Sequence, residues 1–337
     1  MTDRKTASSE FLASHGWENA ERRFLAGDAS DRSYDRLTRG GETAVLMDAP
    51  PGTGDDPADF IAIALHLQNI GLSSPKILAQ DLAQGFLLIE DLGDALFARV
   101  LKCSPERECS LYCSAADVLV QLHAHPAPTG LADLSAQDWA QAATFALDWY
   151  AYAATGQRPD TAAFISTLTD VLKRHADGPR VLILRDYHAE NLLDLPGRQG
   201  VASVGLLDFQ LAQMGQPGYD LVSLLQDARR DVSAAVAAQV TEHFANATHC
   251  DLATLKTACA ALGAQRSLRI LGIFARLCVV GGKPGYLRLM PRVWQHLQTN
   301  LAHPDLSDLR AVCAPLLPPP TDAVLRKIGD KCATLSP

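Results

Sequence analysis

The sequence lacks any cysteine arrangement typical of a metal site or a disulfide framework. It has eight cysteines, but no CxxC pair and no cysteine–histidine group at zinc spacing. Cys109 and Cys113 stand four residues apart on an expected helix, where small buried apolar side chains are the simpler interpretation. His123 and His125 would point to different faces of a helix, so we expect no metal there. We therefore expect reduced thiols in a reducing compartment.

The chain also lacks an excess of positive charge and any long apolar run. Lys and Arg number 30 against 38 Asp and Glu, which gives a net charge of −8. A basic surface for nucleic acid is therefore not indicated. Residues 201–207 and 270–280 are the longest apolar stretches, well short of the roughly 18 residues that span a bilayer. Residues 1–10 are polar and unlike a secretory signal. These absences predict a cytoplasmic protein without nucleic acid, membrane or obligate protein partner.

What the sequence has is the length and composition of a globular protein with two lobes. Its 337 residues are 47% hydrophobic and 20% charged, and domains average roughly 150 residues. A helix is expected at 57–70, and the Pro-rich segment 315–320 is expected to be a surface tail. The expected strands of the first part are 23–25, 33–38, 43–47, 77–79 and 85–89. The expected helices of the second part are 105–125, 136–152, 161–175, 219–227, 234–247, 252–279 and 290–301.

Two short apolar runs interrupt the helical part, and an aspartate follows each within two residues. The first run, 181–184, leads into LRDYHAEN at residues 184–191. This has the R-D-x-x-x-x-N spacing of a phosphotransfer loop, in which Asp accepts a hydroxyl proton and Asn binds a metal ion. The second run, 205–207, ends in Asp208 and Phe209, where Asp would bridge Mg²⁺ and Phe would pack inward. Either acid alone would also suit a turn at a strand end, but their order together predicts a phosphotransfer site.

Over nearly its whole length the chain resembles the aminoglycoside phosphotransferase branch of the protein-kinase-like fold. Within that branch it is similar to bacterial anomeric sugar kinases, which phosphorylate N-acetylmuramate and N-acetylglucosamine at carbon 1 during cell-wall recycling. The phrases that carry this similarity are GDASDRSY, AVLMDAPPG, GFLLIEDLG, LRDYHAENLL, LLDFQLAQMGQPGYDLVSLLQDARRDV, RILGIFARL and GKPGYLRLMPRVW.

The resemblance implies an α+β, protein-kinase-like fold with two lobes. Residues 1–92 would form a nucleotide-binding lobe with a small antiparallel β-sheet and one helix. Residues 93–337 would form a larger, mainly helical lobe with the catalytic loop and the acceptor pocket. ATP and Mg²⁺ are the implied cofactors, and a small-molecule sugar is the implied partner.

The resemblance also implies roles for individual residues. Asp186 would be the catalytic base, and Asn191 and Asp208 would bind Mg²⁺. The anomeric hydroxyl is more acidic than other sugar hydroxyls because it adjoins the ring oxygen, so one carboxylate is a sufficient base. Glu90 and Leu92 would lie in the hinge between the lobes, where backbone groups receive the adenine. The same segment would also suit an ordinary strand end.

The chain departs from the kinase pattern at the phosphate-binding lysine. Met47 stands at that place, and the helix expected over 58–70 contains no Glu. Both halves of the ion pair are missing together, which avoids an unpaired buried charge. Another cation should then meet the phosphates. Arg32 is the first choice, with Ser30 in the same turn, and Arg36 is the second. For Arg32 the alternative is a solvated surface arginine.

The acceptor is expected to bind about twenty residues after the metal loop, at Asp227, Arg229 and Arg230. An Asp can accept two sugar hydroxyls, and an Arg can bind a carboxylate with two hydrogen bonds. N-acetylmuramate has a lactyl carboxylate that N-acetylglucosamine lacks, so a deeply buried Arg cannot read it if both are substrates. Asp220 either braces the catalytic loop or caps a helix, and His123 either matches a family histidine or is a core residue; for both we favour the structural role.

Two other functions stay open. A kinase for an aminoglycoside, a choline-like alcohol or another small metabolite is one. The mixture of acids and arginines after Asp208 argues against a pocket for a polycation. A nucleotide-binding pseudokinase is the other, suggested by Met47, although nothing structural would require Asp186, Asn191 and Asp208 together. Arginines on later helices, Arg269, Arg276 and Arg292, are expected on solvated faces.

Overall fold

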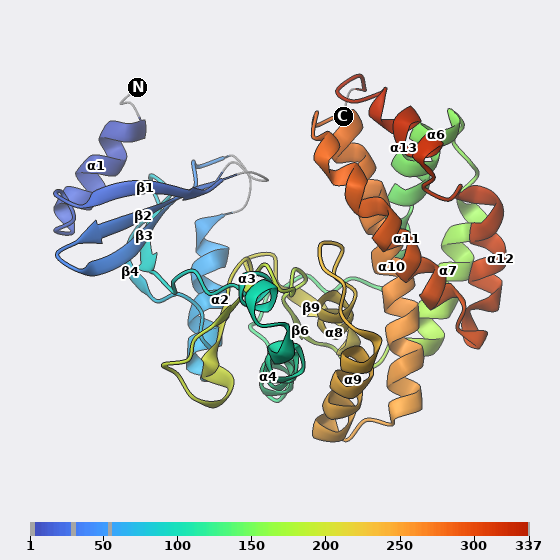
Figure 1. Cartoon of the computed structure of the whole chain (residues 1–337), viewed down its shortest axis with the longest axis horizontal. Coiled ribbons are helices and arrows are strands. Elements are labelled where there is room, and N and C mark those ends of the chain that lie inside the picture. Colours follow the sequence, from blue (N-terminus) through green and yellow to red (C-terminus); the bar gives the residue numbers. More distant parts are fainter. Residues whose placement is uncertain (1–3, 28–31, 53–55, 336–337) are drawn as a thin grey trace. The chain divides into compact units, whose positions relative to one another are not determined.

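The computed structural model of the chain describes residues 4–27, 32–52 and 56–335. It divides into two compact units (Figure 1). The first unit comprises residues 1–129 and 184–212, and the second comprises residues 130–183 and 213–337. The predicted lobe boundary after residue 92 stays a prediction.

A five-stranded antiparallel sheet in the order β1-β2-β3-β5-β4 organises the first unit. Its strands are β1 (Glu21–Ala26), β2 (Ser33–Arg39), β3 (Glu42–Asp48), β4 (Ile77–Asp81) and β5 (Phe86–Glu90). The expected strands are thus confirmed, with ends shifted by a few residues. Successive side chains of a strand point to opposite faces, so Ala44 and Leu46 lie on one face of β3 while Val45 and Met47 lie on the other.

An N-terminal helix packs on one face of this sheet, and a second helix follows strand β3 in the chain. On the face of Ala44 and Leu46, Phe11 and Leu12 of α1 (Arg4–Ser14) pack into one apolar cluster. Helix α1 was not predicted, because its sequence has few apolar positions. Helix α2 (Pro57–Asn69) begins at its N-cap Asp56, whose side chain accepts from the Ala58 backbone N–H, and it confirms the helix expected at 57–70.

The remainder of the first unit consists of helices and one hairpin. Helices α3 (Phe97–Cys103) and α4 (Glu108–His123) precede the hairpin of β7 (Leu192–Asp194) and β8 (Val204–Leu206), in which Leu192 pairs with Leu206. Strand β8 confirms the apolar run at 205–207, whereas β7 was not expected. The hairpin matters because its open end carries two of the predicted site residues.

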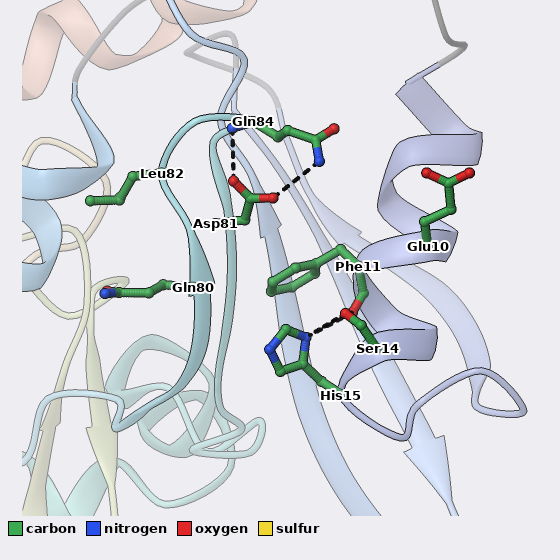
Figure 2. Close-up of a pocket in the computed structure, with 8 residues that line it drawn as sticks. All are labelled: Glu10, Phe11, Ser14, His15, Gln80, Asp81, Leu82 and Gln84. Carbon is green, nitrogen blue, oxygen red and sulfur yellow. Dashed lines mark hydrogen bonds between the residues drawn. The ribbon is translucent and has the colours of Figure 1, made fainter.

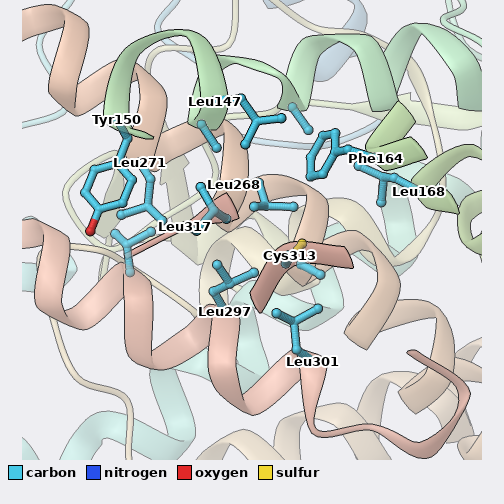
Figure 3. Close-up of a cluster of buried hydrophobic side chains, with 14 of the residues drawn as sticks. Leu147, Tyr150, Phe164, Leu168, Leu268, Leu271, Leu297, Leu301, Cys313 and Leu317 are labelled. Carbon is cyan, nitrogen blue, oxygen red and sulfur yellow. The ribbon is translucent and has the colours of Figure 1, made fainter. Parts of the chain in front are cut away.

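The second unit is helical around one apolar core. Strand β6 (Val181–Ile183) pairs there with β9 (Gln213–Gly215). Figure 3 shows part of the core, with side chains of α7, α10 and α11 packed together. Its helices are α5 (Ala136–Ala143), η2 (Ala146–Ala151), α6 (Tyr152–Thr155), α7 (Ala162–His175), α8 (Gly218–Leu225), α9 (Ala234–Thr248), α10 (Leu252–Val279), η4 (Pro284–Leu289), α11 (Met290–Leu301), η5 (Pro304–Leu306), α12 (Ser307–Leu316) and α13 (Asp322–Gly329).

The expectation of a Pro-rich surface tail at 315–320 holds for Pro315 and Pro319, which are exposed, but not for Leu317. Helix α12 runs through Pro315, Leu317 is 3% exposed, and the Tyr150 hydroxyl donates to the Pro318 carbonyl at 2.6 Å. The segment is therefore packed against the core, because Leu317 supplies an apolar anchor between prolines.

Two expected absences concern the cysteines and the described helices. All eight cysteines are described, and none takes part in a disulfide. Among the described helices none is both long and apolar enough to cross a membrane.

Candidate active site

The loop before β7 brings Asp186 and Asn191 together. The Asn191 side-chain amide donates to the backbone carbonyl of Asp186 at 2.9 Å. The buried Tyr187 anchors the loop, because its hydroxyl donates to the Ala115 carbonyl in α4 at 2.9 Å. The Asp186 carboxylate is half-buried and has no hydrogen-bond or ion-pair partner among the described residues. It is therefore open to accept a proton.

Asp208 follows β8 and lies beside Asn191. The antiparallel pairing of β7 with β8 places the two ends next to each other, and the Leu207 backbone N–H donates to the Asn191 carbonyl at 3.0 Å. The Asn191 Nδ2 atom lies 3.5 Å from Asp208 Oδ2. The structure thus brings together the asparagine and both aspartates of the two motifs.

Two residues of these loops have a strained backbone. Arg185 has a φ of 72° and Asp208 a φ of 57°, in the left-handed region that costs a non-glycine residue roughly 1–3 kcal/mol. Local hydrogen bonds hold both: Gln210 Nε2 donates to Asp208 Oδ1 at 2.8 Å, and Arg185 donates to the Leu211 carbonyl at 3.4 Å. Such strain persists only where the surrounding structure imposes it, and residues of this kind are common in functional loops.

The side chains of Asn191 and Asp208 fit a magnesium site. Because the Asn191 Nδ2 donates to a carbonyl, its Oδ1 is left to accept or to bind a cation. The Asp208 side chain is 46% exposed, so its oxygens can be reached. In the part of the chain that is described, no three His, Cys, Asp or Glu side chains are grouped to hold a metal. Mg²⁺ commonly binds one or two protein carboxylates together with substrate phosphates and water, which the Asn191 and Asp208 oxygens fit.

Phe209 and Met47 occupy the places expected from the kinase pattern, one in which a Phe packs inward and one in which the strand lysine is replaced. Phe209 is fully buried and stacks on Phe60 of α2, with ring centroids 4.9 Å apart. Met47 is also fully buried, and α2 contains no Glu. The structure therefore has no lysine–glutamate pair at this place, as the sequence predicted.

Arg32 approaches the Asp208 carboxylate. Its Nη2 lies 3.9 Å from Asp208 Oδ1, and the residue is only 7% exposed. The alternative of a solvated surface arginine is therefore wrong. A largely buried guanidinium beside this carboxylate suits an anionic ligand. Ser30, the other predicted phosphate contact, lies outside the described residues.

A cavity of about 350 Å³ adjoins Asn191 and Asp208, a volume typical of small-ligand sites. Its apolar walls include Val45 and Ile89, and the segment 90–94 forms another side. Within the described residues the backbone amide and carbonyl of Leu92 have no hydrogen-bond partner. The cavity thus offers a free peptide group between apolar walls, whereas Asp186 and Arg32 are not among its lining residues.

Arg36 organises the segment beside this cavity. Its guanidinium donates to Asp94 Oδ2 at 2.7 Å and to Asp91 Oδ1 at 2.9 Å. The hydrogen bond from Arg36 lowers the pKa of Asp94. The guanidinium is therefore committed to carboxylates, which contradicts the second choice of Arg36 as a phosphate ligand. The sequence analysis missed this cluster, although two acids following a buried strand were a signal that a cation is needed.

The Glu90 side chain is likewise engaged within the protein. Its Oε1 accepts from Arg198 at 2.7 Å, and its Oε2 accepts from the Lys76 backbone N–H at 3.2 Å. The Glu90 backbone N–H donates to the Lys76 carbonyl at 2.8 Å. Of the two predicted hinge residues, Leu92 has the open backbone groups, and the assignment of Glu90 stays a prediction.

The predicted acceptor residues lie in the second unit, directly after α8. Asp227 is 2% exposed, and its Oδ1 accepts from the Arg229 backbone N–H at 2.8 Å. Arg229 is exposed and Arg230 is half-buried. The structure therefore brings these three together on one short segment, and their role toward the acceptor stays a prediction.

Asp220 is fully buried, whereas His123 is half-buried at the end of α4. Asp220 is fully buried in the first turn of α8, but the N-cap of that helix is Pro217, without a side-chain cap bond. The interpretation of Asp220 as a simple N-terminal cap is therefore wrong. Burial lowers the pKa of His123 to about 4, which supports the core interpretation of this histidine.

Another hollow, of about 540 Å³, lies between α1 and the turn after β4 (Figure 2). Its polar side chains bond within their own segments, since His15 Nδ1 lies 2.8 Å from the Phe11 carbonyl and Gln84 Nε2 donates to Asp81 at 3.0 Å. None of the residues of the two motifs lines it, so it is not the candidate active site.

Comparison with known proteins finds similar sequences over most of the chain. Residues 21–253 match the profile of the phosphotransferase enzyme family. An N-acetylmuramate/N-acetylglucosamine kinase of Caulobacter vibrioides is 37% identical, with 92% of this chain and 96% of that protein covered. The protein of the same name from Pseudomonas aeruginosa is 33% identical, with 91% and 93% covered.

Solved structures agree on the fold. A choline/ethanolamine kinase family protein from Mesorhizobium loti superimposes with a TM-score of 0.62 at 15% identity, covering 97% of this chain and 99% of that one. A putative aminoglycoside phosphotransferase from Ralstonia eutropha has a TM-score of 0.63 at 16% identity, covering 91% and 98%. The predicted α+β, protein-kinase-like fold class is thereby confirmed.

Proposed function

The chain belongs to the phosphotransferase enzyme family, and we propose that it is an ATP-dependent kinase of the anomeric hydroxyl of N-acetylmuramate and N-acetylglucosamine. The sugar is supported by the names of the curated relatives, which align over almost the whole chain. The observation that carries the chemistry is the meeting of Asp186, Asn191 and Asp208 in one unit.

Asp186 would act as the general base. Its carboxylate has no partner among the described residues, and it is held on a loop that the buried Tyr187 anchors. An anomeric hydroxyl is an acidic alcohol, so a single carboxylate can accept its proton as the oxygen attacks the γ-phosphorus. The bond from that phosphorus to the bridging oxygen of ADP breaks, and ADP leaves.

The protein's main contribution would be positioning and charge neutralisation, since phosphoryl transfer needs little covalent work from the enzyme. Asn191 and Asp208 would hold Mg²⁺, which neutralises phosphate charge when bound. Arg32, largely buried beside Asp208, would supply the cation that the missing strand lysine supplies in the kinase pattern.

ATP would place its adenine in the cavity beside segment 90–94. The apolar walls at Val45 and Ile89 suit a flat ring, and the open backbone amide and carbonyl of Leu92 suit its polar edge. Glu90, held by Arg198, would fix the start of this segment. Asp227, Arg229 and Arg230 would contact the acceptor.

A coupled assay of ADP release tests the proposal. We expect turnover with N-acetylglucosamine and N-acetylmuramate, and none with the 1-O-methyl glycoside of N-acetylglucosamine, because the acceptor oxygen is then blocked. An aminoglycoside and choline serve as alternative acceptors in the same assay. Turnover with either of these and not with the free sugars would overturn the sugar assignment, and turnover with the methyl glycoside would show that another hydroxyl accepts.

A further inference from the structure

Helix α11 (Met290–Leu301) carries an apolar and a polar stripe side by side. Val293, Leu297 and Leu301 recur every four residues and are at most 2% exposed. Figure 3 shows Leu297 and Leu301 within the apolar core of the second unit. The residue before each of them is polar, and these three form the second stripe: Arg292, His296 and Asn300. Burial of the apolar stripe fixes the helix and hence the direction of the polar stripe.

The polar stripe lies along the segment 226–231 in reverse chain order, and its two outer residues are hydrogen-bonded to it. Asn300 and Gln226 exchange two amide hydrogen bonds, of 2.8 Å and 3.0 Å. One turn earlier, His296 lies close enough to the backbone of Asp227 for that backbone to act on its pKa. Burial is the main cause that lowers the pKa of His296, and the Asp227 backbone opposes it.

Arg292 completes the series at the other end of the segment. Its Nη1 donates to the Ala228 carbonyl at 3.0 Å. The same guanidinium binds the Asp231 carboxylate with two hydrogen bonds, of 2.5 Å and 2.8 Å. The Asp231 side chain is 75% exposed, so this pair adds little to stability and mainly sets geometry.

The Gln226–Asn300 pair occupies space that depends on the missing side chain of Gly263. A Cβ at Gly263 of α10 would lie 2.7 Å from Gln226 Oε1 and would clash with the Asn300 side chain. Asn300 itself is 4% exposed. By contrast, Gln226 and Asp231 line a cavity of about 930 Å³. Beside that cavity, hydrogen bonds to α11 hold Gln226 and Asp231, the two ends of the segment.

We propose that Arg292, His296 and Asn300 are positioning residues that fix the acceptor-binding segment 226–231. The proposal rests on the proposed function, which assigns Asp227, Arg229 and Arg230 to the sugar. Asp227 itself is 2% exposed, its Oδ1 accepts from the Arg229 backbone, and the next residue, Ala228, accepts from Arg292. A substitution in the polar stripe should displace the side chains of Asp227, Arg229 and Arg230. It should leave the proposed nucleotide-binding residues of the first unit in place.

The test is Arg292→Ala, measured for both substrates. Loss of a charged hydrogen bond to the Ala228 carbonyl should raise the KM for the sugar about tenfold. The KM for ATP should stay unchanged, which a general loss of folding would not produce. Arg292→Lys keeps the charge and one donor nitrogen but not the planar fork, so it should recover part of the loss. Arg310→Ala, an exposed position on α12, is the matched control and should change neither KM.

Peptide-level hydrogen exchange of the full chain gives a second readout that needs no turnover. The Arg292→Ala variant should exchange faster at residues 226–231, and the Arg310→Ala control should not. An unchanged sugar KM or unchanged exchange in this segment would overturn the positioning role. If the unsubstituted enzyme phosphorylates no amino sugar, the proposed function fails, and the exchange experiment still decides whether the stripe holds the segment.

Discussion

Asp186 is the residue on which the proposed chemistry depends most directly. In Asp186→Asn the side chain keeps its shape but loses the ability to take a proton. We expect kcat to fall by about 10²–10⁴-fold, while the ATP dissociation constant measured by calorimetry stays the same. Asp170→Asn, at an exposed position of α7, should leave kcat unchanged. Turnover that survives in Asp186→Asn would show that another group is the base.

The KM for ATP tests the role of Arg32, because the proposed partner of this residue is phosphate. In Arg32→Ala, loss of a charged contact should raise the KM for ATP about tenfold or more, with little change in the KM for the sugar. Arg32→Lys keeps the charge but not the planar fork, so its KM for ATP should lie between those of the native sequence and of Arg32→Ala. An unchanged KM for ATP in Arg32→Ala would remove this residue from the site.

The β7–β8 hairpin is the element that carries Asn191 and Asp208, and its flanks are tied to the sheet unit. The Leu206 backbone N–H donates to the Ser73 carbonyl at 2.8 Å, and the Ser73 hydroxyl donates to the Ala202 carbonyl at 2.7 Å. On the other side Arg198 binds Glu90 at 2.7 Å. These bonds explain why the hairpin belongs to the same compact unit as the sheet.

Arg198→Ala removes one of those ties. Because the ion pair is partly exposed, stability should change by less than about 1 kcal/mol. The Mg²⁺ concentration for half-maximal activity should instead rise about threefold, since the open end of the hairpin is held less firmly. Lys102→Ala, on the exposed side of α3, is the control. A thermal shift with an unaltered Mg²⁺ requirement would mean that the tie is only structural.

At the same scale, elements with a strong local pattern could be predicted from the sequence. Helices α10 and α11 begin and end as expected, because their apolar periods are long and Asp251 caps α10. The R-D-x-x-x-x-N and D-F motifs also located the asparagine and both aspartates. Each of these signals lies within a single segment of the chain.

Features made by distant partners could not be predicted. Arg36 binds Asp94 across 58 residues, and Tyr150 binds the Pro318 carbonyl across 168. Strand β9 is three residues long and exists only because β6 pairs with it. Local propensity carries no information about such pairings. The sequence alone therefore offers Arg36 as a second choice for a phosphate contact and predicts that the Pro-rich segment lies on the surface.

For the whole molecule, the pH dependence of unfolding should depend on His123 in α4. Burial lowers the pKa of this histidine from its ordinary 6.5 to about 4. Between these values the unfolded chain binds a proton that the folded chain does not. The free energy of unfolding therefore falls as the pH falls from about 6.5 to about 4, and this contribution is fully present only above pH 6.5.

Urea unfolding at pH 7 and pH 4.5 measures that contribution by difference. Titrating carboxylates affect the native sequence and a His123→Leu variant alike, so they cancel. The native sequence should lose about 2 to 3 kcal/mol more than the variant between the two pH values, at about 1.36 kcal/mol per unit of pKa. His15→Gln, at an exposed position of α1, should behave like the native sequence. Equal losses in the His123→Leu variant and the native sequence would mean that His123 is reached by water or ionises with a partner, and the low pKa would then be wrong.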